Sequence, residues 1–153
     1  MRTIHIIAAF VFVFAFLIRI VYLDTIPGNL NPDEADTLRT YIWNTTRHSL
    51  NLFGFNWNGA PALNMIIMGS SWEVFHESIF GLRLPSAITS SIAIYLFVYL
   101  GYFLTRSSTL AASFGLILST NTWFLNFSRS AWENVWNAAP LMALAIGLYL
   151  LIT

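Results

Sequence analysis

The chain has 153 residues, of which 57% are hydrophobic and 9% are charged, against the roughly one quarter of charged residues that is usual in soluble domains. This composition predicts an integral membrane protein of several passes, in the plasma membrane if the source is prokaryotic. Seven arginines balance seven acids, so there is no basic patch for a nucleic-acid partner. The absence of cysteine excludes disulfides and thiolate chemistry.

The first predicted element is a membrane span over residues 4–23. About 20 apolar residues make roughly 30 Å of helix, which is the thickness of the hydrocarbon core. A signal peptide is the competing interpretation, but the apolar run is longer than usual and no small-residue cleavage pattern follows it. Arg19 lies one turn from the end of the run, and we expect its side chain to extend to the membrane interface.

Residues 24–84 are predicted to form an outer loop that contains two juxtamembrane amphipathic helices. The first helix should begin at Pro32, because Asn31 is a suitable N-cap and Glu34 stands where a capping box requires an acid. Asp33, Glu34 and Asp36 therefore lie near a helix N-terminus. Acids are common there, since each gains roughly 0.3–1 kcal/mol from the helix dipole, and this stretch alone does not require chemistry.

The second helix of the loop lies within residues 61–80, and its position decides the topology. Glu73 and Glu77 are spaced to form a polar stripe, and charged groups are costly at membrane depth, so a surface position of this segment is favoured over a membrane crossing. This position also leaves Arg2 and Arg106 on the inner side, as the positive-inside rule favours. His76 and Glu73 resemble half of a two-metal motif, but no second Glu-x-x-His is present.

Three further spans are predicted over residues 85–104, 109–127 and 135–153. The chain is thus expected to be an all-α polytopic bundle, a single membrane module over 1–153. Because the last span ends without a charged flank, we expect the module to be the N-terminal part of a larger protein. Two spans separate Asp33 from Glu133 in this topology, which places both acids on the outer face.

Two carboxylates on one membrane face could share a divalent metal ion, or one could act as a general base while the other orients it. Arg83 and Arg129 flank the same outer surface in this topology. A guanidinium can grip a phosphate through two parallel hydrogen bonds. The alternative is that both arginines are interfacial anchors.

The order of these motifs resembles the GT-C membrane glycosyltransferases, in the branch of the protein O-mannosyltransferases and the lipid A aminoarabinose transferases. An Asp-Glu pair opens an outer-loop helix, followed by a Pro-led segment, an Arg-Leu-Pro-Ser span start and an acid after a Ser-Arg. These motifs are Asp33-Glu34, Pro61-Ala62-Leu63, Arg83-Leu84-Pro85-Ser86-Ala87 and Ser128-Arg129-Ser130-Ala131-Trp132-Glu133. Each motif is weak alone, and their order and spacing carry the resemblance.

The resemblance implies inverting transfer of a sugar from a polyprenyl-phosphate carrier to an acceptor at the outer or lumenal face of the membrane. Asp33 matches the expected base and Glu133 the acid of the second loop, with a possible divalent metal ion between them. Glu34, Arg83 and Arg129 are expected to support the site or bind substrate. The alternative function is a noncatalytic small membrane protein that binds or stabilises a partner. A transporter fragment is less well supported, because no span is interrupted at its centre by Gly or Pro.

Overall fold

The computed structural model describes residues 2–46 and 62–152, without the side chains of Arg2 and Glu133, and all regular elements in this part of the chain are helical. The elements are α1 (Arg2–Ile20), α2 (Pro32–Thr46), α3 (Ala62–Val74), α4 (Ile79–Thr105), α5 (Ser108–Thr120), α6 (Thr122–Ser128), the 3-10 helix η1 (Glu133–Asn137) and α7 (Ala138–Ile152). Of the motifs quoted above, Pro61 lies outside the described residues.

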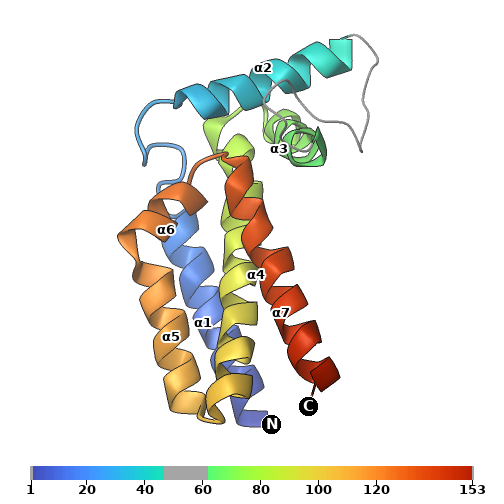
Figure 1. Cartoon of the computed structure of the whole chain (residues 1–153). Helices are drawn as coiled ribbons and strands as arrows, with labels where there is room; N and C mark the ends of the chain where they lie inside the picture. Colours follow the sequence, from blue (N-terminus) through green and yellow to red (C-terminus); the bar gives the residue numbers. More distant parts are fainter. Residues whose placement is uncertain (1, 47–61, 153) are drawn as a thin grey trace.

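The bundle is organised around α4, which packs against α1, α3, α5 and α7. Figure 1 shows α1, α4, α5 and α7 running alongside one another, while α2 and α3 lie across one end of the bundle. The short helix α6 and the start of α7 lie at this same end, which we call the α2 end, and both chain termini lie at the opposite end. The helices α2, α3 and α6 and the start of α7 therefore gather at one end of the bundle.

The core of the bundle is built from small and branched side chains. Ala8 and Ala15 of α1, Val98 of α4 and Ala111 of α5 are all fully buried or nearly so. Small residues allow helix backbones to approach closely, as is usual between membrane helices. The outward faces are apolar as well, with Leu148 of α7 about half exposed, which is suited to lipid.

Three described helical stretches are long and apolar enough to cross a membrane, namely Thr3–Ile20, Ile79–Thr105 and Asn134–Ile152. They support a membrane location. The second stretch begins six residues before the expected start at residue 85, because Ser78 caps the helix by accepting a hydrogen bond from the Gly81 N–H at 3.1 Å. Pro85 then lies inside α4 and does not begin it.

Residues 109–127 do not form the one continuous helix expected for a span there, because the helix breaks at Asn121. The residue ends α5 and caps α6, where its side chain accepts a hydrogen bond from the Phe124 N–H at 3.0 Å. Asn competes well with helix continuation through such local hydrogen bonds. The polar run 119–122 was the signal for this break. The helix α5 has 13 residues, and only three of the four expected spans reach the length of a membrane crossing within the described residues.

The segment 61–80 forms no long helix. The helix α3 ends at Val74, and His76 and Glu77 both adopt positive φ, of 56° and 59°, in the turn that leads into α4. Glu77 is therefore not on a helical stripe with Glu73, contrary to the expectation. Figure 1 shows α3 beside α2, across the end of the bundle, and the position of this segment at a membrane surface stays a prediction.

Arg19 does not extend to the interface as expected. Its side chain is completely buried between α1, α4 and α5, where Nε donates to Ser90 Oγ at 3.2 Å and Nη1 donates to the carbonyls of Ala15 at 2.9 Å and Ser119 at 3.5 Å. The guanidinium also lies 5.5 Å from the centre of the Phe124 ring. The expectation considered one helix alone, whereas the neighbouring helices supply the polar partners.

Candidate functional site

The N-terminus of α2 has the predicted capping box. The Glu34 N–H donates to Asn31 Oδ1 at 2.8 Å, and the Asn31 N–H donates to Glu34 Oε2 at 3.0 Å. The helix begins at Pro32, whose missing N–H has no cost at the first helical position. The sequence-based prediction of this helix start is confirmed.

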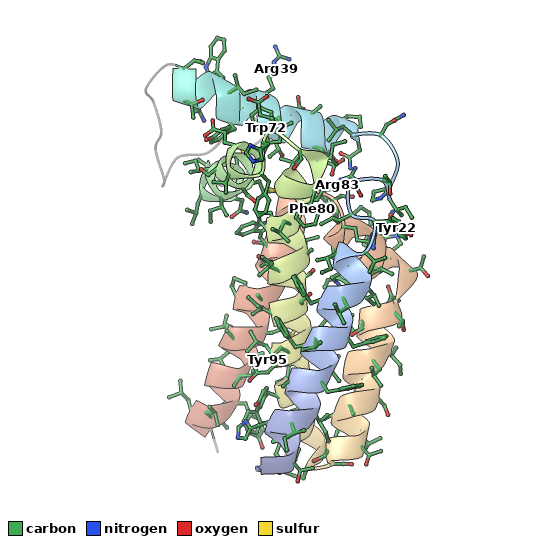
Figure 2. All side chains as sticks on the ribbon, turned by 180° about the vertical axis from the view of Figure 1, so that it is seen from behind. Tyr22, Arg39, Trp72, Phe80, Arg83 and Tyr95 are labelled. Atoms are coloured by element: carbon green, nitrogen blue, oxygen red, sulfur yellow. The ribbon has the colours of Figure 1, made fainter. Side chains whose placement is uncertain are left out.

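Glu34 also forms a buried salt bridge with Arg83 at the head of α4. Arg83 Nε donates to Glu34 Oε1 at 2.7 Å and Nη2 donates to Oε2 at 3.0 Å, and both side chains are fully buried. Arg83 Nη1 donates to the carbonyls of Leu23 at 3.1 Å and Pro27 at 2.7 Å. Figure 2 shows Arg83 beneath α2, where α4 meets the loop from α1. The side chain thus joins α4 to the loop between α1 and α2 and to the first turn of α2.

A third segment reaches the same carboxylate. The Ala131 N–H, from the loop between α6 and η1, donates to Glu34 Oε1 at 2.9 Å. We call this cluster of Asn31, Glu34, Arg83 and Ala131 the Glu34 junction. Burial opposes the ionisation of Glu34, but the hydrogen bonds from Arg83, Ala131 and Asn31 outweigh it and hold the pKa of the carboxyl below its usual value. The junction therefore contains an ionised carboxylate at neutral pH.

Arg129 makes a second set of contacts with the end of α1. Its Nη1 donates to the Ile18 carbonyl at 2.6 Å, and its Nη2 donates to the Val21 carbonyl at 2.7 Å. Nε and Nη2 also donate to the Ile26 carbonyl, at 3.2 and 3.1 Å. Burial lowers the pKa of this guanidinium, and the nearby Arg83 lowers it further. Arg129 therefore fixes the chain as it leaves α1.

These contacts differ from the surface position expected for the two arginines. Arg83 is fully buried and Arg129 is 7% exposed, and the hydrogen bonds described above involve every nitrogen of both guanidinium groups. Neither side chain is arranged to grip a phosphate at the outer surface through a free pair of donors. Their arrangement supports the loops at the α2 end.

Asp33 differs from its neighbour Glu34 in being exposed to solvent. It lies in the first turn of α2, next to the residue that anchors this turn to α4. Asp36 is partly buried on the following turn. At this helix start the side chain of Asp33 is exposed to solvent, while the adjacent Glu34 is fixed by its hydrogen bonds to Arg83.

Glu133 is the first residue of η1 and lies two residues after Ala131, whose N–H binds Glu34. The backbone of the second loop thus meets the first turn of α2 at the Glu34 junction. Figure 1 shows the start of α7 at the same end of the bundle as α2. The backbone segments that contain Asp33 and Glu133 thus lie at the same end of the bundle, and the prediction that both acids face one side of a membrane stays a prediction.

No group of three His, Asp or Glu side chains suited to a metal ion occurs in the part of the chain that the structure describes. The proposed metal ligands are Asp33 and Glu133, and the side chain of Glu133 is outside the described part. Mg²⁺ is often held by one or two carboxylates together with substrate phosphates. The metal role of these two acids stays a prediction.

Two contributors to this end of the bundle were not predicted from sequence. The contact of Ala131 is made by its backbone N–H, so the residue type gives no indication of it. The sequence did give an indication for Arg19, because an arginine within an apolar run either reaches the interface or finds buried partners. A search of protein families, curated proteins and solved structures finds no match to this chain.

Proposed function

We propose that the chain is a multi-pass membrane module of a glycosyltransferase that uses a polyprenyl-phosphate sugar donor. The observation that supports the proposal is the Glu34 junction. Three of the motifs that carry the resemblance, Asp33-Glu34, the Arg83 segment and the Ala131-Trp132-Glu133 segment, are far apart in sequence. They meet through hydrogen bonds to one carboxylate.

Two arginines support the orientation of the module. Arg2 begins α1 and Arg106 follows α4 at the end opposite α2, although Arg39 lies on α2 itself. Arginine is favoured on the cytoplasmic side of a membrane protein. In the proposed orientation the α2 end faces outward or toward the lumen, and Asp33 stands at the surface where a lipid-linked donor would present its sugar.

Asp33 would act as the general base. The acceptor hydroxyl oxygen attacks the anomeric carbon as the bond from this carbon to the phosphate oxygen breaks, the proton passes to the Asp33 carboxylate, and the electron pair leaves with the polyprenyl phosphate. A positioned base of this kind contributes about 10²–10⁴-fold to a rate. The leaving phosphate requires positive charge, which a divalent ion held by Asp33 and Glu133 would supply.

The test compares Asp33→Asn with Asp36→Asn in the complete protein. Membranes that contain each variant are incubated with radiolabelled polyprenyl-phosphate mannose, and transfer of the label to endogenous acceptors is measured. We expect Asp33→Asn to lower transfer by about 10²-fold or more, with unchanged insertion and amount of protein. Asp36→Asn should retain transfer. Near-normal transfer by Asp33→Asn would contradict the assignment of the base.

The alternative proposal is a noncatalytic membrane protein that binds or stabilises a partner. It is favoured by one observation, namely that Glu34, Arg83 and Arg129 make internal contacts that hold loops together. It predicts that Asp33→Asn has no consequence for any transfer reaction. It also predicts that the protein and its partner are recovered together from membranes to the same extent for both variants.

A further inference from the structure

An open groove lies between the end of α1 and the short helix α6. Its volume is about 960 Å³, and its walls include Leu17 of α1, Val21 directly after α1, and Trp123 of α6. These three side chains are 50% exposed or more. Tyr22, which also lines the groove, lies where α1 passes into the loop toward α2 (Figure 2). The groove is thus mainly apolar and lies at the α2 end of the bundle.

A buried positive charge borders this apolar groove. Arg129 is part of its lining. Nη1 of Arg129 carries two N–H groups and donates to one carbonyl, that of Ile18. The Glu34 carboxylate, which is the buried acid at this end of the described chain, is already bound by Arg83, Ala131 and Asn31. Arg129 therefore has carbonyl dipoles around it and no carboxylate partner among the described residues.

Arg19 adds a second buried positive charge behind the first. It is completely buried, and its Nη2 has no hydrogen-bond partner within the described part of the chain. An uncompensated buried charge is costly, and structures usually supply a counter-ion or neutralise the group. Arginine remains protonated in proteins, so neutralisation is not open to either side chain. Of the two arginines, Arg129 lines the groove and Arg19 does not, so a negative charge in the groove would offset mainly the charge of Arg129.

The position of the groove indicates the source of that negative charge. It borders α1, which is long and apolar enough to cross a membrane. The rings of Trp123 and Phe127 lie 4.3 Å apart, and those of Phe127 and Trp132 lie 4.3 Å apart as well. Aromatic residues of this kind collect at the headgroup level of a bilayer. A ligand here meets apolar walls toward the bundle centre and positive charge at the headgroup level.

We propose that this groove binds an anionic phospholipid, with its phosphate beside Arg129 and an acyl chain along Leu17 and Val21. The site is separate from the chemistry proposed for Asp33, and it does not depend on that proposal. Its occupant is a bilayer component that compensates the buried charge and holds α6 against α1.

The test introduces a negative charge into the groove without touching the guanidinium contacts. Asn126 lines the groove and its side chain is exposed, while its backbone carbonyl accepts the Arg129 N–H at 3.2 Å and Ser130 Oγ at 3.3 Å. Asn126→Asp keeps this backbone contact and the side-chain shape. Asn29→Asp adds the same charge to an exposed loop residue outside the groove and is the matched control.

The full chain in neutral detergent is titrated with short-chain phosphatidylglycerol, phosphatidylcholine and inorganic phosphate, and binding is followed by the rise in the thermal unfolding midpoint. We expect phosphatidylglycerol to bind at least about tenfold more tightly than phosphatidylcholine, and Asn126→Asp to weaken it by about tenfold or more, since like charges near a protein surface repel by a few kcal/mol at about 4 Å. Asn29→Asp should bind like the unchanged protein.

Three results would overturn the proposal. Equal binding of the two phospholipids would show that charge does not select the occupant. Stabilisation by inorganic phosphate to the same extent would show an anion site without a lipid. Unchanged phosphatidylglycerol binding in Asn126→Asp would show that the lipid binds elsewhere on the protein.

Discussion

Replacement of Glu34 by Gln tests whether the Glu34 junction stabilises the module. The change keeps the size of the side chain and removes its charge, so Arg83 would remain fully buried without a counter-ion. The Asn31 N–H and Arg83 Nη2 now donate to Oε2 at 3.0 Å each. An amide NH₂ in the place of Oε2 could not accept these two hydrogen bonds. Loss of one partner from a buried ion pair costs about 3–5 kcal/mol, a large part of the roughly 5–15 kcal/mol that stabilises a typical protein.

The free energy of unfolding would be measured in mixed detergent micelles by tryptophan fluorescence. Glu34→Gln should lower it by about 3–5 kcal/mol, and Asp33→Asn, one residue away and exposed, by about 1 kcal/mol or less. Glu34→Leu combined with Arg83→Met should cost less than the sum of the two single changes, with a coupling energy of about 1 kcal/mol or more. The buried ion pair would not stabilise the module if Glu34→Gln lowered the free energy of unfolding by less than about 0.5 kcal/mol. The same would follow if the effects of Glu34→Leu and Arg83→Met were additive.

Two further predictions concern pH and packing. The folded-state pKa of Glu34 lies below its unfolded value, so its contribution to stability is fully present above about pH 4.5 and is lost as the pH falls through the folded pKa. The thermal unfolding midpoint should therefore fall as the pH is lowered below about 4.5, and this fall should be smaller in Glu34→Gln. Gly69→Ala should destabilise the module by about 1–3 kcal/mol, because a Cβ at Gly69 would lie 2.1 Å from Cγ of the Tyr41 ring, which is 4% exposed. Gly147→Ala, where a Cβ would meet nothing within 4 Å, is the control and should be neutral or slightly stabilising; equal stability of the two alanine variants would contradict the packing argument.

Local features of the chain were predictable from sequence. The start of α2 depends on Asn31, Pro32 and Glu34, which lie within four positions of one another, and the capping rules describe contacts of this range. The break at Asn121 was missed although it is also local, because hydropathy over a long window gives four polar residues little weight. A reading of turn chemistry within the apolar run would have found it.

Contacts between distant segments were not predictable in the same way. Arg83 and Glu34 are 49 positions apart, and Ala131 and Glu34 are 97 apart. No pattern in the sequence states which arginine meets which acid. The prediction that all three segments lie at one end of the bundle followed from counting spans, but the pairing within that end depends on side-chain packing. For the same reason Arg19 was assigned to the interface, whereas neighbouring helices enclose it.

The shortness of α5 has a consequence for the lipid around the protein. Its 13 residues make roughly 20 Å of helix, about 10 Å less than the hydrocarbon thickness of a bilayer. A bilayer accommodates a short apolar helix by becoming thinner beside it. The leaflet next to α6 would therefore dip toward the middle of the membrane, and lipid headgroups would stand deeper there than around α7. The protein would in this way set the depth at which lipid headgroups stand beside its α2 end.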